Sequence, residues 1–348
     1  MSIDSETNGN NTSTFLLKEG NVSFNSQSVR FLNNGAEEYY DAVGVSSDKS
    51  LVSILSWNGE EGEILLYDSE GNKLFDFESI MLADEASFGM YTLGNGNTIL
   101  RDKIANFTFY DTFGEITTSV SNSSQSKGGE AISEVAINES GKTVVLYNPQ
   151  IKRDGTLGSK AQVRTGVEEF KDIYFSSDRY LKDVTVSDDG SFIALITARD
   201  GTSDQVLIMD KYGNELNTIS ADEDLKGINF TNNLEQVTIY SGGRVMVHNT
   251  LTGESLGATS LRSPVIVADY FPEDNLILAL TGNYSDQSGL LNSVNFRAIN
   301  LEQRSIASQQ LSGALGMSDI IDVEFKRNAS NNFMLEGANK RVNIRANF

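Results

Sequence analysis

The stretch that most constrains the fold is residues 182–216, KDVTVSDDGSFIALITARDGTSDQVLIMDKYGNEL, because the rest of the chain reads as diverged copies of it. Three short apolar runs, Val184–Val186, Phe192–Ile196 and Val206–Met209, are separated by turns rich in Gly and Asp. A fourth, weaker strand can follow Gly213. Four short antiparallel strands joined by such turns form one unit of a repeat protein. The stretch therefore predicts an all-β fold assembled from small sheets.

Copies of this unit recur along the chain. The turn after the first strand marks each copy, and successive markers are separated by about 41 to about 54 residues, a spacing typical of four-stranded propeller blades. The pattern predicts a seven-bladed β-propeller of four-stranded antiparallel blades. The predicted blades begin near residues 39, 86, 132, 181, 225, 265 and 319, and the marker turns lie at Asp48, Gly94, Ser140, Asp189, Asn233, Asp274 and Asn328.

The two ends of the sequence bear on how such a ring would close. The seventh copy is one strand short, and apolar residues recur over residues 14–32 in the pattern of one or two half-buried strands. Because an open blade edge is prone to aggregation, we expect residues 14–32 to complete the last blade. Residues 1–13 are polar and acidic, so we predict a disordered acidic tail there and a single propeller domain over residues 14–348.

A second marker closes the hairpin after the third strand. Asp68, Asp111 and Asp210 are each followed by a glycine three residues later. An Asp side chain can accept hydrogen bonds from its own turn, and Gly supplies the positive φ that such a turn requires. This spacing therefore predicts turn structure and needs no functional explanation.

Charge and residue usage exclude several classes of function. The chain has 27 Lys and Arg against 48 Asp and Glu, a net charge of −21, so nucleic acid and anionic membrane surfaces are poor partners. The absence of Cys excludes disulfides, zinc–thiolate sites and thiol nucleophiles. The single histidine, His248, argues against a multi-histidine metal site and favours a structural role. No G-x-S-x-G nucleophile motif is present.

Three features bear on where the protein is located. No apolar run approaches the ~18 residues of a membrane span, so we expect no direct membrane insertion by this chain. The first residues lack the basic start and apolar core of a signal peptide, whereas N-x-S/T sequons recur, for example at Asn21 and Asn106. An extracytoplasmic or cell-surface location is slightly favoured, with a cytoplasmic location as the alternative.

The repeat resembles one known family. The run VSDDGSFIALIT at residues 186–197, followed by QVLIMDKYGNEL at residues 205–216, is similar to the WD-repeat-like β-propeller repeat of the TolB type. The diverged copies extend this resemblance over about residues 39–346. The chain departs from the family in lacking a proline in nearly every first turn and a Trp-Asp dipeptide after the third strands. The resemblance implies a propeller with a binding role and indicates no particular ligand.

Charged side chains recur near the start of the first strands, which in a propeller line the central channel. Carboxylates there could hold a divalent cation or a basic group of a partner. The other interpretation is that the entrance of the channel is lined by solvated polar side chains and binds nothing. We predict no cofactor, with a divalent cation as the only candidate ligand of this kind. The candidate metal ligands are Glu134, Asp183 and Asp322, and the candidate partner-binding residues are Asp41, Lys182 and Lys226.

A repeat ring without a recognisable catalytic motif favours a non-enzymatic binding function. We expect a scaffolding module that binds a protein or a surface glycan, at the cell surface or within a larger assembly. The long loops at residues 147–160 and 281–293 are the candidate contact sites. The alternative is a metal-dependent lyase or hydrolase with an acidic site at the channel mouth. An intracellular scaffold differs from the first hypothesis only in its location.

Overall fold

A computed structural model of the chain describes residues 2–8, 13–17, 20–25, 28–33, 36–39, 42–46, 50–57, 62–68, 71–79, 89–101, 106–120, 134–138, 141–153, 156–166, 169–285, 290–302, 305–310, 315–316, 324–329, 332–336 and 341–347. Within these residues the regular elements are β-strands, apart from one 3-10 turn at Pro272–Asp274. The predicted all-β class is therefore confirmed for the described part of the chain. None of the described residues belongs to a helix with the length and hydrophobicity of a membrane span.

The chain forms two compact units. The N-terminal unit consists of Thr12–Ile193 and Asp210–Asn214, and the C-terminal unit consists of Met1–Asn11, Ala194–Met209 and Glu215–Phe348. The division passes through one sheet, which is the repeat unit that dominates the sequence. Its strands are β18 (Tyr180–Val186), β19 (Phe192–Ala198), β20 (Asp204–Asp210) and β21 (Glu215–Ala221).

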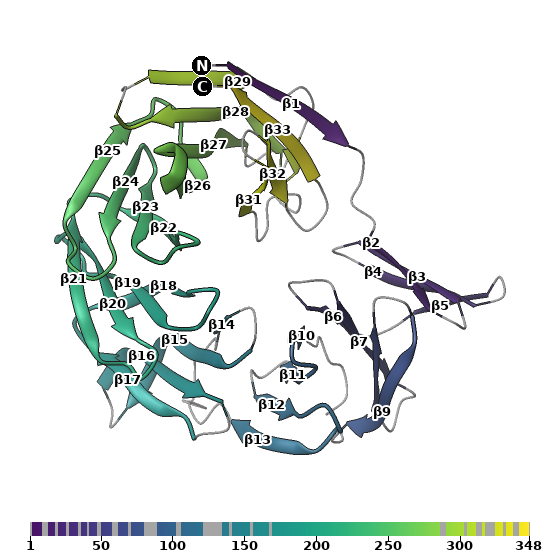
Figure 1. The fold of residues 1–348 in the computed structure, drawn as a ribbon. Helices are drawn as coiled ribbons and strands as arrows, with labels where there is room; N and C mark the ends of the chain where they lie inside the picture. Colours follow the sequence, from purple (N-terminus) through teal and green to yellow (C-terminus); the bar gives the residue numbers. More distant parts are fainter. Residues whose placement is uncertain are drawn as a thin grey trace. The chain divides into compact units, whose positions relative to one another are not determined.

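Four further antiparallel sheets belong to the N-terminal unit, and in each of them neighbouring strands follow chain order (Figure 1). The first contains β2 (Ser13–Leu17), β3 (Gly20–Asn25), β4 (Ser28–Asn33) and β5 (Ala36–Tyr39). The second contains β6 (Ala42–Val45), β7 (Leu51–Trp57), β8 (Gly62–Asp68) and β9 (Lys73–Ser79). The third contains β10 (Gly89–Thr92), β11 (Thr98–Arg101), β12 (Phe107–Tyr110) and β13 (Ile116–Val120), and the fourth β14 (Glu134–Ile137), β15 (Thr143–Arg153), β16 (Thr156–Thr165) and β17 (Lys171–Ser176).

Three antiparallel sheets belong to the C-terminal unit. One contains β22 (Leu225–Phe230), β23 (Gln236–Ser241), β24 (Arg244–Asn249) and β25 (Ser255–Ser260). The next contains β26 (Val265–Phe271), β27 (Leu276–Ser285), β28 (Leu290–Asn300) and β29 (Ser305–Gln310), with β30 (Leu315–Gly316) also paired to β28. The last contains β31 (Glu324–Ala329), β32 (Asn332–Glu336), β33 (Arg341–Asn347) and, beside β33, β1 (Ser2–Asn8).

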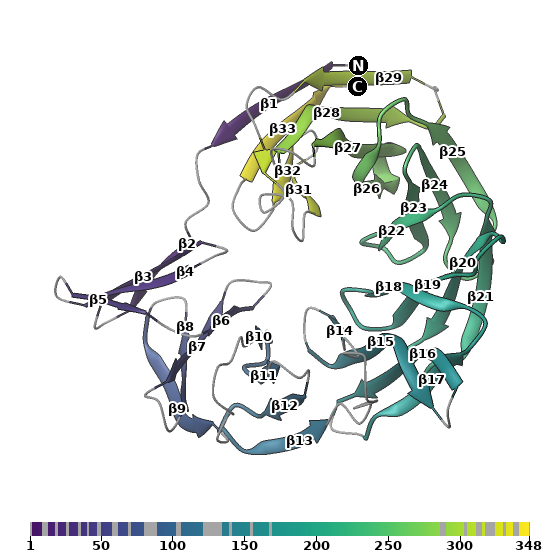
Figure 2. The ribbon, with the colours of Figure 1, turned by 180° about the vertical axis from the view of Figure 1, so that it is seen from behind.

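The N-terminal residues differ from two sequence-based predictions. Residues 2–8, predicted to be disordered, form β1, which pairs with β33 from Ser2 opposite Asn347 to Asn8 opposite Arg341. Figure 1 and Figure 2 both show this pairing, with the two chain ends close together. Backbone hydrogen bonds to an edge strand require no apolar side chains, so a polar segment can form a strand there.

The segment predicted to close the last blade also behaves differently. An N-terminal strand does join the sheet of β31–β33, but it is β1 and not residues 14–32. The strands within residues 14–32 pair with one another and with β5 to make a sheet of their own. The described residues therefore form eight sheets where the repeat count predicted seven.

Apolar side chains on the faces of the sheets form the core of each unit. In β20, Val206 and Ile208 are buried while Gln205 and Leu207 are partly exposed, the period of two expected of a strand between layers. The buried members pack against side chains of the following sheet, among them Ile239. In the N-terminal unit an equivalent cluster joins the sheets β10–β13 and β14–β17 through Phe107, Phe109, Val144 and Leu146.

The Asp-Gly turns have the predicted chemistry. In the third turn of the repeat, Asp210 Oδ1 accepts the backbone N–H groups of Tyr212 and Asn214, both at 2.9 Å, and Gly213 has a φ of 80°. In all three turns the glycine backbone N–H also donates to the carbonyl oxygen of the Asp, and Gly71 and Gly114 have positive φ like Gly213. The prediction that this spacing makes turns is confirmed.

Candidate functional site

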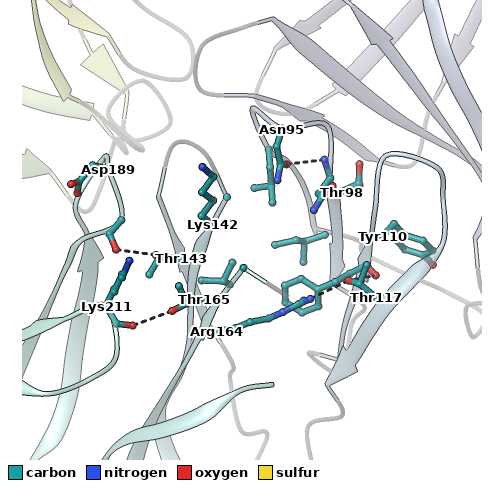
Figure 3. Close-up of a pocket in the computed structure, with 18 of the residues that line it drawn as sticks. Asn95, Thr98, Tyr110, Thr117, Lys142, Thr143, Arg164, Thr165, Asp189 and Lys211 are labelled. Carbon is teal, nitrogen blue, oxygen red and sulfur yellow. Dashed lines mark hydrogen bonds between the residues drawn. The ribbon is translucent and has the colours of Figure 1, made fainter. Parts of the chain in front are cut away.

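A cleft of about 400 Å³ lies at one end of the strands in the N-terminal unit (Figure 3). Its rim is formed by turns between first and second strands, at Asn95, Lys142 and Asp189, and by turns between third and fourth strands, at Gly166 and Lys211. In an antiparallel sheet whose strands follow chain order, these turns lie at the same end of the strands. Segments far apart in the sequence therefore meet around one opening, whose volume is that of a small ligand pocket.

Hydrogen bonds between sheets hold the rim together. Thr143 Oγ1 donates to the carbonyl oxygen of Gly190 at 2.9 Å, and Thr165 Oγ1 donates to that of Lys211 at 3.1 Å, as Figure 3 shows. Asn138 Nδ2 adds a bond of 3.1 Å to the carbonyl oxygen of Asp188. Each bond joins the sheet β14–β17 to a turn of the following sheet. The turns of the rim are therefore held in place by hydrogen bonds between sheets.

Arg164 of β16 is buried beneath the cleft, with 5% of its surface exposed. Its register partner is Val144, which packs in the core shared with β10–β13, so Arg164 points into the same interface. The guanidinium Cζ lies 5.0 Å from the centroid of the Phe109 ring, and Nη2 donates to Thr117 Oγ1 at 3.3 Å. Within the described residues Nε has no hydrogen-bond partner. Burial lowers the pKa of Arg164, but arginine remains protonated at neutral pH.

Two lysines join Arg164 at the opening. Lys142 is exposed in the β14–β15 turn, and Lys211 is half-buried in the β20–β21 turn with Nζ 5.1 Å from the centroid of the Tyr212 ring. Among the described residues no ion pair joins any of these three cations to a carboxylate. The cleft thus gathers positive charge on a chain whose net charge is −21.

Asp189 is the acidic member of the rim in the described part of the chain, and its oxygens are already engaged. They accept hydrogen bonds from Ser187 Oγ at 2.8 Å, from the Ser191 backbone N–H at 2.8 Å and from the Ser191 hydroxyl. Burial disfavours the charged carboxylate, but these bonds outweigh it and lower the pKa of Asp189. Asp189 is therefore ionised at neutral pH and bound within its own turn.

An apolar patch lies on the other face of the sheet β10–β13. Phe75 of β9 and Phe113 of the β12–β13 turn form a T-shaped pair with ring centroids 5.4 Å apart, although they are 37% and 71% exposed. Ile116, 46% exposed, is the register partner of Tyr110, whose ring contacts Phe77 of β9, so Ile116 lies on the same face. We call Phe75, Phe113 and Ile116 the apolar patch.

Two of the three predicted metal ligands, Glu134 and Asp183, lie near Tyr147. Glu134 is the register partner of Tyr147, and burial, followed by the negative charges of Asp183 and Glu134, raises the pKa of the Tyr147 phenol. Burial also raises the pKa of Asp183, although its Oδ1 accepts the backbone N–H of Val184 at 2.9 Å. Glu134 is the first residue of β14, at the end of that strand opposite the cleft, and Asp183 lies at the middle of β18.

The remaining predicted residues do not extend this pair. Asp322 and Asp41 lie outside the described residues. Lys182 is half-buried in β18, and Lys226 forms an exposed ion pair with Asp224. No group of three or more His, Asp and Glu side chains in the described ranges could hold a metal ion. The metal site and the partner-binding roles stay predictions.

The two long loops are hairpin extensions of strands where the structure describes them. Residues 147–160 fall mainly within β15 and β16, and residues 281–293 mainly within β27 and β28. Ser159 Oγ donates to the carbonyl oxygen of Pro149 and accepts the backbone N–H of Leu181 at 3.0 Å, which fastens the first hairpin to β18. Their role in partner binding is also still a prediction.

Sequence reasoning missed both the cleft and the apolar patch. Phe113 and Tyr212 each stand two residues after the Asp of an Asp-Gly turn, and turn chemistry gives no reason for an aromatic side chain there. An aromatic residue at the same position of two Asp-Gly turns was the sequence signal that could have indicated an exposed binding surface. Nothing local marks Arg164, because its burial depends on packing between two sheets.

No protein-family model matches the sequence, and a search of curated proteins found no match. Solved structures do resemble the fold. The Dos1 propeller matches with a TM-score of 0.56 and 12% identity over 98% of this chain and 93% of that one. The C-terminal WD40 domain of Sif2 matches with a TM-score of 0.54 and 12% identity over 100% of this chain and 99% of that one.

A third similar structure is the WD40 domain of SCAP from fission yeast, with a TM-score of 0.50 and 9% identity over 99% of this chain and 98% of that one. At such low identity the similarity shows the fold alone. The chain has a WD-repeat-like β-propeller fold, as the resemblance of its repeat predicted.

Proposed function

We propose that this chain is a non-enzymatic propeller that binds another protein. The proposed binding surface is the end of the N-terminal unit that carries the apolar patch and the cleft. The observation that carries the proposal is the apolar patch. A T-shaped aromatic pair held 5.4 Å apart is an ordered arrangement, yet Phe113 remains 71% exposed. Exposed apolar surface of this kind marks interaction sites, and aromatic anchors contribute much of the energy at protein interfaces.

The expected occupant is a polypeptide with apolar and acidic side chains. The β12–β13 hairpin separates the apolar patch from the cationic cleft, since Phe113 lies in its turn while Phe109 and Thr117 line the cleft. A partner that covers the hairpin would meet apolar surface on one face and positive charge on the other. Charge complementarity therefore favours an acidic segment over a basic one.

The finer architecture also belongs to this proposal. We infer that each four-stranded sheet is a propeller blade and that β1 completes the blade formed with β31–β33. Binding of a surface glycan and a cell-surface location are retained as predictions of the sequence.

The test is the affinity of a purified partner for matched variants. A partner captured with the intact protein would be purified, and its Kd measured against wild type, Phe113→Ser and Leu251→Ser. Leu251 is 59% exposed in the corresponding Asn249–Gly253 turn of the C-terminal unit, so it controls for loss of an exposed apolar side chain. We expect Phe113→Ser to weaken binding at least ~10-fold, about 1.4 kcal/mol, and Leu251→Ser to have no effect. Equal affinity for all three proteins would refute the proposed surface.

The alternative is a metal-dependent lyase or hydrolase, and the specific observation in its favour is the position of Glu134 and Asp183 around Tyr147. Divalent cations should then raise the melting temperature of wild type and not that of Asp183→Ala. An identical response of both proteins to calcium, manganese and zinc would leave this alternative without support.

A further inference from the structure

We propose that the cleft binds a carboxylate group on an acidic segment of the partner, with Arg164 as the buried anchor and Lys142 and Lys211 at the rim. The inference rests on the proposed protein-binding function and names the chemistry that the cleft recognises. It goes beyond the apolar patch, because the cleft lies on the other face of the hairpin and uses different residues.

The state of Arg164 provides the main argument. A buried cation is costly unless charges or hydrogen bonds compensate it. Here a ring contact with Phe109 and one long hydrogen bond to Thr117 are the interactions observed for the guanidinium, and Nε is unpartnered within the described residues. A guanidinium carries five N–H donors in a planar fork that matches a carboxylate. The cleft thus contains unused donors beside an open volume.

The rim supports the same assignment. Lys142 and Lys211 come from turns of different sheets, and hydrogen bonds from Thr143 and Thr165 hold these turns together (Figure 3). Asp189 adds one negative charge to this rim, but its oxygens accept hydrogen bonds from Ser187 and Ser191, and within the described residues it forms no ion pair with the lysines. Lys142, Arg164 and Lys211 therefore line one opening, with Asp189 as the carboxylate among the described lining residues.

The volume of the cleft and the net charge of the chain indicate which kind of anion can bind. A cleft of about 400 Å³ accommodates one or two side chains of a peptide at a time. The net charge of −21 opposes nucleic acid, whose binding needs many basic contacts. A carboxylate carried by a peptide is consistent with both limits and with the apolar patch beside the cleft.

The test is the binding of a fluorescein-labelled tetraglutamate peptide to the intact protein, followed by fluorescence anisotropy. Tetraglutamine is the neutral control peptide, and inorganic phosphate as a competitor tests whether a free anion is preferred. We expect wild type to bind tetraglutamate and Arg164→Gln to bind it at least ~10-fold more weakly. Arg244→Gln, which removes an exposed arginine of the C-terminal unit that pairs with Glu223, should bind like wild type.

Arg164→Met separates ligand binding from structural support. If the buried charge is kept for a ligand, methionine should abolish tetraglutamate binding while the melting temperature stays equal or rises, because an apolar side chain of similar length fits the interface without an unpaired charge. A fall in melting temperature with unchanged peptide binding would assign Arg164 to structure and overturn the inference.

Other outcomes would also overturn the inference. These are absence of tetraglutamate binding to wild type, equal loss in Arg164→Gln and Arg244→Gln, and binding of phosphate alone. The proposed function is judged separately, because its variant Phe113→Ser lies outside the cleft. Loss of partner affinity in Phe113→Ser without any tetraglutamate binding would reject the anion site and retain the protein-binding surface.

Discussion

Gly213 shows that the backbone conformation of a turn in the repeat limits which residue can occupy it. Its φ is 80°, and a Cβ at this position would lie 2.0 Å from Ile173 Cγ2. Gly166, at a φ of 64°, has no atom within 4 Å of its would-be Cβ. The two glycines belong to the same unit and differ in surroundings, so they separate backbone strain from steric overlap.

We predict that Gly213→Ala destabilises the protein more than Gly166→Ala. Both changes place alanine in the left-handed region, at a cost of about 1–2 kcal/mol. Only Gly213→Ala must also displace the branched Ile173 side chain, which should add at least about 1 kcal/mol. Urea-induced unfolding of the two variants measures the difference, and equal midpoints would contradict the packing described at this turn.

Asp183 connects a predicted site residue to the pH dependence of stability. Burial raises its pKa above the ordinary value of 3.8, so ionisation is more costly in the folded state than in the unfolded state. The free energy of unfolding is therefore highest below the pKa that Asp183 has in the unfolded state. It falls as the pH rises through the higher pKa that Asp183 has in the folded state. Asp183 is therefore a source of instability at neutral pH.

We predict that Asp183→Asn raises the melting temperature at neutral pH and leaves it unchanged below about pH 3.5, where both forms are neutral. Asparagine keeps an acceptor for the Val184 N–H, so the hydrogen bond survives the change. Asp200→Asn, in an exposed turn, is the control. A lower melting temperature for Asp183→Asn at neutral pH would mean that the charge itself stabilises the fold.

At the scale of strands, the local sequence pattern predicted the strands and turns of the main repeat. The position of β1 depends instead on pairing with a distant strand. The apolar runs and Asp-Gly turns of β18–β21 are legible because each strand and turn carries its own signal. Strand β1 has the sequence SIDSETN, in which Ile3 is the one large apolar residue, so the segment looks disordered by itself. It is ordered because β33, more than three hundred residues later, presents an edge to pair with.

We predict that deletion of residues 2–8 lowers the melting temperature and promotes self-association, because it exposes the edge of β33. Adding a synthetic peptide of residues 2–8 should restore part of the stability, since backbone pairing needs only the strand. Calorimetry and size-exclusion chromatography measure the two effects. A deletion variant with unchanged melting temperature and elution would show that β1 contributes nothing to the sheet.

At the scale of the whole molecule, the fold was predictable and the candidate site was not. A repeat spacing is visible along one chain, and it led to the propeller fold that the similar solved structures share. The cleft instead depends on Lys142, Arg164 and Lys211, which come from three separate segments and meet only after the sheets pack. Its charge is opposite to that of the chain, so composition conceals it.

The central claim, a protein-binding surface for acidic and apolar segments, can be measured by display selection. A random peptide library would be selected on the intact wild-type protein, and each enriched peptide would be measured against Arg164→Gln and Phe113→Ser. We predict enrichment of Asp or Glu beside large apolar residues, with affinity lost in both variants. Enriched peptides without acidic residues, or peptides that bind all three proteins equally, would contradict the account.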